Sequence, residues 1–439
     1  MKLKSIVVGA ALALGLAPGP SLAAPEAGPP TSLRVDDWRM SAAALDVLWR
    51  AALIQHPETT RQAVALAVAE DRVLARYAQQ HVSPAQLRPG WRVGFAPEVN
   101  AQAALMATLE RVFEADLRPA IGPEGPQRFV VRQYPVDTQS LAALWGDRTP
   151  PALDDRLSDE ALERLTRVPV LDHRVDEQGP IRTVSLRDVW HQLDVHGRQA
   201  VKRGDARFVH HQALRIVRAA WVRHWLQSHQ RLQPADFEAL AQSMADRELR
   251  LALEQAWGAS GQLHGAQEAL TLLRAEATAA DIRAYYLAHP EQFARTERVR
   301  AQHIRCGDTA CAEAASAALQ RGEAFATVAQ RYSTASSAVQ GGSLGWVEAG
   351  RSSGRWLAQL ALAQAPGEPS RPIREPEVGG GPVRWQIVQV VDREQGVHPL
   401  DSETTRFIAA EGWARERAVE RFTALKERLV REAAVQLSP

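Results

Sequence analysis

The sequence is poor in lysine and cysteine, and its excess charge is small. Only four of its 52 basic residues are lysine, at positions 2, 4, 202 and 426. The formal net charge is +1 at pH 7 and becomes −1 if the N-terminal segment with Lys2 and Lys4 is removed. A chain with so little excess charge has no overall positive field that would attract phosphate groups. Nucleic acid is therefore not an expected partner.

Long apolar runs are also missing beyond the first residues. The start MKLK is basic, SIVVGAALALGLA is an apolar run, and SLAA offers small residues for cleavage after Ala23. Because about 20 apolar residues are needed to span a membrane, the run predicts a signal peptide at residues 1–23 and no stable membrane anchor. No cysteine directly follows it for lipid attachment. We expect an exported, periplasmic protein.

The two cysteines, Cys306 and Cys311, lie together in HIRCGDTAC. In an oxidising compartment a disulfide across this short loop is the expected state. A redox role is a weaker alternative, because the spacing is not C-x-x-C. His303 does not complete a metal site with them, because residues 303 and 306 face opposite sides of a strand. The sequence predicts no metal and no cofactor.

The length and the hydrophobic pattern predict more than one folding unit. At 439 residues the chain exceeds the usual size of a single core. Residues 24–292 are mostly helical, with the apolar stripe Leu66, Ala69, Val73 and Tyr77 as an example of helical spacing. After them, short strands and helices alternate. We expect strands at 298–305, 369–373 and 384–391, and helices at 310–321, 323–331 and 354–363.

Five motifs follow one another in residues 296–394: VRAQHI, RGEAFATVAQRYS, GGSLGW, PGEPSRPI and WQIVQVVD. In this order and spacing they resemble a parvulin-type peptidyl-prolyl cis-trans isomerase domain. The helical region before them and the long helix after them resemble exported foldases of the SurA and PpiC type. The resemblance implies an α+β fold class: a mainly helical N-terminal domain and a small domain with a mostly antiparallel sheet.

The resemblance also implies a polar group that acts on an X-Pro bond. Such a site twists the bond in a dry recess, and it needs no covalent nucleophile. His303 matches the first of two histidines in the family, and Gln386 stands where the second is usual. Ala335 occupies the position of a Cys or Asp. The implied catalytic residues are thus His303 and Gln386, with part of the polar network missing, although His303 could equally be a hydrogen-bonded core histidine.

An apolar cup for the proline ring is the second part of the family's site. Leu344 matches the cup leucine, and Trp356 matches the cup aromatic, with Leu357 as the alternative in a shifted register. Ser352 stands where a methionine is usual. The implied substrate-binding residues are Leu344, Ser352 and Trp356, and plain packing is the alternative role for Trp356.

The C-terminal residues 395–439 predict a long amphipathic helix that needs an apolar partner. Its stripe is Ala414, Ala418, Phe422, Leu425 and Leu429. By resemblance to the foldases, this helix packs on the N-terminal domain, and AAVQL pairs as a strand with SLRVDDW. A dimer contact is the alternative.

Two functions follow as hypotheses. One is an exported foldase that binds and isomerises X-Pro segments of secreted or envelope proteins, with weak catalysis. The other is a non-catalytic periplasmic chaperone or assembly factor that uses a degenerate parvulin domain to bind peptides. Unfolded or partly folded protein clients are the expected partners in both, and the sequence leaves the oligomeric state open.

Overall fold

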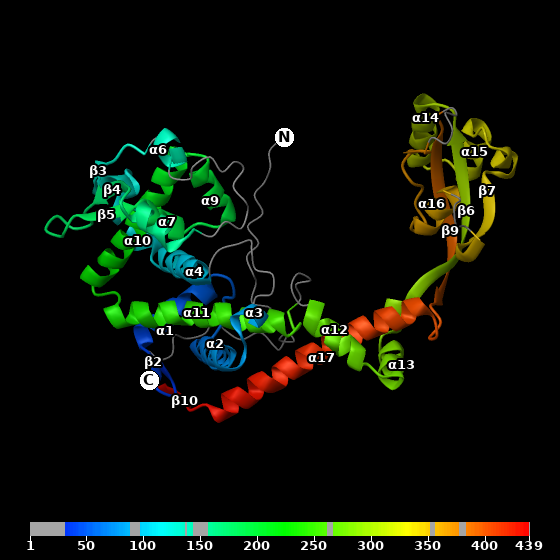
Figure 1. Cartoon of the computed structure of the whole chain (residues 1–439). Coiled ribbons are helices and arrows are strands. Elements are labelled where there is room, and N and C mark those ends of the chain that lie inside the picture. The colour runs from blue at the N-terminus through cyan, green and yellow to red at the C-terminus, as the bar shows by residue number, and fades with distance from the viewer. Residues whose placement is uncertain are drawn as a thin grey trace. The chain divides into compact units, whose positions relative to one another are not determined.

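A computed structural model describes residues 31–87, 97–136, 138–143, 157–260, 267–351, 356–376 and 383–438. The expected signal peptide lies outside these residues. Two compact units make up the described chain, as the labels in Figure 1 allow the reader to follow. The first unit contains the described residues up to Ala269 and those from Ala418 onward, and the second unit is Leu270–Arg417. Within the described residues, no helix combines the length and the apolar character needed to cross a membrane.

The first unit is mainly helical, as predicted, and carries two small antiparallel sheets. Its helices are α1 Ala42–Leu53, α2 Arg61–His81, α3 Pro84–Leu87, α4 Pro97–Val112, α5 Glu114–Ile121, η1 Gly125–Phe129, α6 Thr138–Ala143, α7 Asp159–Thr166, α8 Leu186–His191, α9 Val195–Lys202, α10 Ala206–Ser228 and α11 Pro234–Ala256. Its strands are β1 Ser32–Val35, β2 Trp38–Met40, β3 Val130–Gln133, β4 Pro169–His173, β5 Arg182–Ser185 and β10 Val435–Ser438.

The larger core of this unit lies among α1, α2, α4 and α11. Helix α2 packs against α11 and buries Ala65, Ala69 and Val73. Leu66, which the sequence pattern placed on the buried stripe, is 42% exposed. It lies about 100° around the helix from Ala65, so the stripe prediction was wrong at this residue. A three-residue count along a helix therefore did not fix the centre of the buried face.

The predicted pairing between the two ends of the chain is confirmed. Strands β10, β1 and β2 form a three-stranded antiparallel sheet in that order, with Leu33 opposite Leu437. The Asp36 carboxylate accepts a hydrogen bond from the Ala434 backbone N–H at 3.0 Å. Residues about 400 positions apart thus complete one sheet.

The second small sheet, in the order β3-β4-β5, was only partly anticipated. In the sequence IRTVSLRDVWHQL, residues 181–193, a short strand-like run leads into Ser185, and this run is β5. Strands β3 and β4 gave no clear sequence signal. The three strands cover the smaller core of the unit with Val170, Leu171 and Val184. Ser185 then starts α8 with a capping box that it shares with Asp188.

The second unit contains a four-stranded antiparallel sheet in the order β7-β6-β9-β8. Its strands are β6 Ala294–Cys306, β7 Ser343–Glu348, β8 Ile373–Arg374 and β9 Trp385–Val397. Its helices are α12 Gln267–Glu276, which begins just before the unit boundary, α13 Ala279–Ala288, η2 Pro290–Phe293, α14 Thr309–Gln320, α15 Phe325–Tyr332, η3 Ser336–Gln340, η4 Ala349–Arg351, α16 Trp356–Ala363 and the first part of α17 Glu403–Glu432.

The predicted strand at 369–373 was misplaced. Only Ile373–Arg374 join the ladder, because Pro369 and Pro372 have no N–H to donate. Ser370 still ties the segment to β9: its backbone N–H donates to the carbonyl of Val388 at 2.8 Å, and its hydroxyl accepts from the Val388 N–H at 2.9 Å. The segment runs alongside β9 but does not form a regular strand.

Each face of the four-stranded sheet covers its own apolar cluster. The α16 face is formed by Val299 and Ala301 of β6, Val388 and Val390 of β9 and Ala361 of α16. The α14 face is formed by Ile304 and Cys306 of β6, Ile387 of β9 and side chains of α14 and α15. Because side chains alternate along a strand, neighbouring residues of β6 belong to different clusters.

Helix α17 contributes to both units. Its first part packs on α13 and η2 through Ala409, Tyr285 and Phe293. Its second part contributes Phe422 and Leu425 to the larger core of the first unit. Residues 270–292, which the sequence pattern grouped with the N-terminal domain, therefore lie with the second unit, because their apolar side chains are covered by α17.

Candidate functional site

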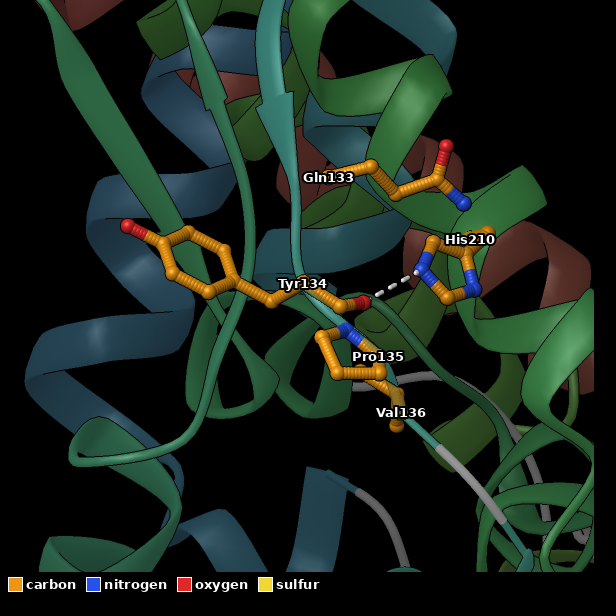
Figure 2. A pocket seen from close by; sticks show the side chains of 5 residues that line it. All are labelled: Gln133, Tyr134, Pro135, Val136 and His210. Atoms are coloured by element: carbon orange, nitrogen blue, oxygen red, sulfur yellow. Dashed lines mark hydrogen bonds between the residues drawn. The ribbon is translucent and has the colours of Figure 1, made fainter.

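The first unit has a recess of about 430 Å³ next to the end of β3 and to α10. Its lining includes Gln133, Tyr134 and His210, and Figure 2 shows the Tyr134 ring turned away from His210. The His210 ring nitrogens lie 2.9 Å from the carbonyl oxygen of Ala206 and 3.2 Å from that of Tyr134. Both nitrogens already face backbone acceptors, so this histidine holds the chain together and is poorly placed for chemistry.

The second unit contains the other histidine of interest, His303. It lies on β6 opposite Val388 of β9, so its side chain projects from the α16 face. Its backbone N–H donates to the carbonyl of Gly342 at 2.8 Å. The glycine-rich loop before β7 is therefore fastened directly to the strand that carries His303.

A chain of four polar side chains runs through His303. The His303 Nδ1 lies 3.0 Å from Gln386 Oε1, and its Nε2 lies 2.8 Å from Ser337 Oγ. The Gln386 Nε2 donates to Glu375 Oε2 at 3.2 Å. The structure thus brings the two predicted catalytic residues, His303 and Gln386, into direct contact.

Sequence reasoning missed the two ends of this chain. Ser337 lies two residues after Ala335 in the loop YSTASSAVQGGSLG, so the paired serines were the signal that could have drawn notice. Glu375 follows β8 directly, and its backbone N–H donates to the Arg384 carbonyl at 2.8 Å. Only the pairing of β8 with β9 brings Glu375 close to Gln386, and no local sequence pattern contains that information.

Burial sets the protonation state of His303. Only 6% of the residue is exposed, and removal from water lowers the pKa of the imidazole below its usual range. The hydrogen bond with Gln386 opposes this shift, and the positive charge of Arg305 adds to it. His303 is therefore neutral at pH 7, with one ring nitrogen as donor and the other as acceptor.

The predicted cup residues are only partly brought together. Leu344 of β7 and Leu357 of α16 both pack on the α16 face and stay partly exposed. Trp356 is half-buried at the first position of α16. The described side chains that pack on the apolar cluster of the α16 face include Leu357 and not Trp356, so the shifted register is the better match. Ser352 lies outside the described residues. An apolar surface next to His303 is thus built from leucines.

Ala335 lies in the loop near His303, at the position where an acid or a thiol was expected. It is only 8% exposed and supplies no polar side-chain atom. The hydroxyl of Ser333 accepts from the backbone N–H groups of Arg305 and Ala335 at 3.0 and 3.2 Å. The Thr334 N–H donates to the Arg305 carbonyl at 2.7 Å. The Ser333 hydroxyl and the Thr334 backbone therefore hold this loop against β6 without an acid or a thiol at Ala335.

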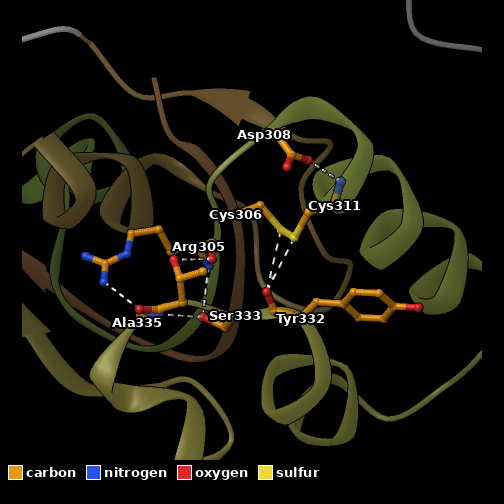
Figure 3. Close-up of a disulfide and its surroundings, with 8 residues drawn as sticks. Arg305, Cys306, Asp308, Cys311, Tyr332, Ser333 and Ala335 are labelled. Atoms are coloured by element: carbon orange, nitrogen blue, oxygen red, sulfur yellow. Dashed lines mark hydrogen bonds between the residues drawn. A yellow bond between two sulfur atoms is a disulfide. The ribbon is translucent and has the colours of Figure 1, made fainter. Parts of the chain in front are cut away.

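A disulfide lies just behind this loop. Figure 3 shows the bond between Cys306, the last residue of β6, and Cys311 in the first turn of α14. Asp308 caps that helix by accepting from the Cys311 N–H at 2.7 Å. The Tyr332 carbonyl oxygen lies 3.4 Å from Cys311 Sγ, directly before the loop that carries Ser337. The bond therefore joins the end of β6 to the start of α14 under the site.

Reduction of this disulfide is expected to lower the free energy of unfolding of the second unit by about 2 kcal/mol, the chain-entropy value for so short a loop. The measurement is chemical denaturation of the protein with and without a thiol reductant, followed by circular dichroism. The Cys306→Ser, Cys311→Ser double variant serves as the control and should not respond to reductant. An equal response of the variant would show that the reductant acts elsewhere.

Among the described residues, no group of three or more histidine, cysteine, aspartate or glutamate side chains is arranged to hold an ion. The side chains that surround His303 are a hydroxyl, an amide and, one step away, a carboxylate. Their arrangement can hold a polar group of a bound peptide and orient it.

Comparisons with known proteins concern mainly the second unit. Residues 277–403 match the family model described as "PPIC-type PPIASE domain". The foldase protein PrsA of Bacillus subtilis is 36% identical over 77 residues, which cover 18% of this chain and 26% of PrsA. The chain thus spans about a quarter of the length of the curated relative that it matches.

One similar solved structure is a PpiC-type peptidyl-prolyl cis-trans isomerase domain, which is 31% identical in sequence. The match covers 24% of this chain and 97% of that chain, with a TM-score of 0.20. PrsA from Bacillus anthracis has 17% identity, 48% and 79% coverage and a TM-score of 0.21. A structure of SurA-like chaperones of Campylobacter jejuni has 17% identity, 48% and 92% coverage and a TM-score of 0.21. At these TM-scores the structural likenesses carry no argument.

Proposed function

Because this chain carries a parvulin-type peptidyl-prolyl isomerase domain of the PpiC kind, we propose that it is an exported foldase that binds X-Pro segments of client proteins and isomerises them. The observation that carries the proposal is the contact of His303 with Gln386 and Ser337 at the edge of an apolar surface. The leucines of that surface suit a proline ring, and the polar groups suit the rotating amide.

The chemistry requires little of the protein. Rotation about an X-Pro bond has a barrier of about 20 kcal/mol, and a site that favours the twisted amide lowers it without a covalent step. A neutral, buried histidine held between a hydroxyl and an amide can donate or accept without a net change of charge. Ala335 has a methyl group where an acid or a thiol is usual, and the loss of that polar group is the reason to propose that catalysis is weak.

Export is part of the same proposal. The N-terminal pattern of residues 1–23 supports a cleaved signal peptide and a periplasmic location. The disulfide of the second unit suits an oxidising compartment. In this proposal, the first unit forms a chaperone-like part that holds unfolded secreted or envelope proteins, and residues 296–394 of the second unit act on their prolines.

The test is an isomerisation assay of the full-length mature protein on a proline-containing tetrapeptide. We expect a rate above background, and a loss of about 5- to 150-fold in His303→Ala, because a buried hydrogen bond is worth roughly 1 to 3 kcal/mol. Leu344→Ala should weaken peptide binding. Leu287→Ala is the matched control, because Leu287 is 65% exposed on α13. A rate equal to background in the unmodified protein would refute the catalytic part.

Ala335 supports a second function, a chaperone or assembly factor whose parvulin domain only binds peptides. The side chain at this position supplies no polar group to the amide. In that case the protein suppresses aggregation of an unfolded client, and His303→Ala leaves this activity unchanged. Suppression that falls together with the isomerisation rate in His303→Ala would favour the first function instead.

A further inference from the structure

We propose that Glu375 is a positioning residue that fixes the tautomer of His303 through the side-chain amide of Gln386. The inference rests on the proposed function, since it concerns the same site. It starts from the position of Glu375, which is anchored beside β9 by the hydrogen bond from its backbone N–H to the Arg384 carbonyl. Glu375 does not contact His303 directly and acts through Gln386.

The first step is the orientation of the Gln386 amide. An ionised carboxylate has oxygen atoms that only accept hydrogen bonds. The group of Gln386 that faces Glu375 must therefore be the NH₂, which donates to Glu375 Oε2 at 3.2 Å. This places the amide oxygen toward His303, where Oε1 lies 3.0 Å from Nδ1. Gln386 is 2% exposed, so water offers no alternative partner that would let the amide turn freely.

The second step is the tautomer of the imidazole. The Gln386 oxygen only accepts, so Nδ1 must carry the proton of the neutral ring. Nε2 is then an acceptor, and the Ser337 hydroxyl, 2.8 Å away, donates to it. The carboxylate of Glu375 cannot donate, and this fixes the direction of all three hydrogen bonds between Glu375, Gln386, His303 and Ser337. The lone pairs of Ser337 Oγ are left to receive a donor.

The third step connects this polarity with client binding. Gln386 stands where the parvulin-like motif leads one to expect a histidine. An amide can present either its oxygen or its nitrogen, so the substitution needs a partner that selects one orientation. Glu375 supplies it from the segment directly after β8. The tautomer of His303, and with it the direction in which Ser337 points its hydrogen, is thereby fixed before a peptide binds.

The test is nitrogen NMR of the full-length mature protein labelled with ¹⁵N-histidine. The His303 signals are assigned by their loss in His303→Gln. We expect a protonated Nδ1 and an unprotonated Nε2 in the unmodified protein. In Glu375→Gln the new amide can donate as well as accept, so Gln386 can turn, and a mixture of tautomers is expected. Glu394→Gln is the matched control, because Glu394 pairs with Arg298 on the exposed part of β9.

The isomerisation rate is the second measurement, and one lost hydrogen-bond orientation should lower it about 2- to 10-fold in Glu375→Gln. Glu375→Asp keeps the carboxylate and should retain the single tautomer. An Nε2-protonated His303, or a single unchanged tautomer in Glu375→Gln, would overturn the inference even with full isomerase activity. An absent rate with the expected tautomers would overturn the proposed catalysis and leave the positioning role standing.

Discussion

Gly342→Ala is expected to destabilise the second unit by about 2 to 5 kcal/mol and to abolish isomerisation. Gly342 has a φ of +79°, a left-handed conformation that disfavours a side chain by roughly 1 to 2 kcal/mol. An added Cβ would also lie 2.2 Å from the carbonyl oxygen of His303, a backbone atom that cannot move aside. Relief of that overlap would cost a further ~1 to 3 kcal/mol and would displace β6 from the loop that carries Ser337.

Gly345→Ala separates the two causes. Gly345 has a φ of +66°, yet its added Cβ would have no atom within 4 Å. It should lose only the conformational part, about 1 kcal/mol. Hydrogen exchange of peptides from β6 and β7, read by mass spectrometry, measures the local stability of both variants. Equal losses in the two variants would show that the close approach to His303 contributes nothing.

Gly412→Ala is expected to destabilise the same unit by about 1 to 2 kcal/mol, although alanine is the better helix former. In an exposed helix the exchange would stabilise by about 1 kcal/mol. Here the added Cβ would lie 2.2 Å from both Cζ and Oη of Tyr285. That ring is fixed by a hydrogen bond to Gln292 and by its contact with Phe293, so overpacking outweighs propensity.

A double-mutant cycle tests this prediction, because the effect of Gly412→Ala on stability should change sign when the Tyr285 ring is removed. In a Tyr285→Ala background the space above Gly412 is open, and Gly412→Ala should then stabilise by about 1 kcal/mol. Thermal unfolding of the four proteins supplies the free-energy differences. Destabilisation in both backgrounds would mean that the Tyr285 ring is not the reason for a glycine in the middle of α17.

Local patterns predicted the two long strands and the helices α14, α15 and α16 of the second unit, but they missed β7. The strand expected at 298–305 lies within β6, the strand expected at 384–391 matches the first half of β9, and the helix expected at 310–321 is α14 within a residue. Thr278 and Asp281 have capping-box spacing in the sequence, and the structure forms that capping box. These features depend on residues close in sequence, so periodicity and capping chemistry suffice to find them. The strand predicted at 369–373 was wrong, because Pro369 and Pro372 have no N–H to donate to the ladder.

Some residues of the candidate site were predicted from the sequence, and others were found only in the structure. The motif order was enough to select His303 and Gln386, and their contact on adjacent strands is present in the structure. Ser337 and Glu375 were missed, and Leu357 lies on the α16 face where Trp356 was expected. A shift of one residue on a helix changes which side chain faces a sheet, and sequence spacing alone does not fix that rotation.

By itself the sequence determined the fold class, the main helices and the two long strands of the second unit, and the absence of an acid or a thiol at Ala335, because these depend on residue identity and on short-range periodicity. Tertiary structure alone decided that Glu375 lies next to Gln386, that Tyr285 requires Gly412, and that α17 serves two cores. The physical reason is that hydrogen-bond direction and close packing depend on strand register and helix rotation, which are set by contacts between residues far apart in the chain.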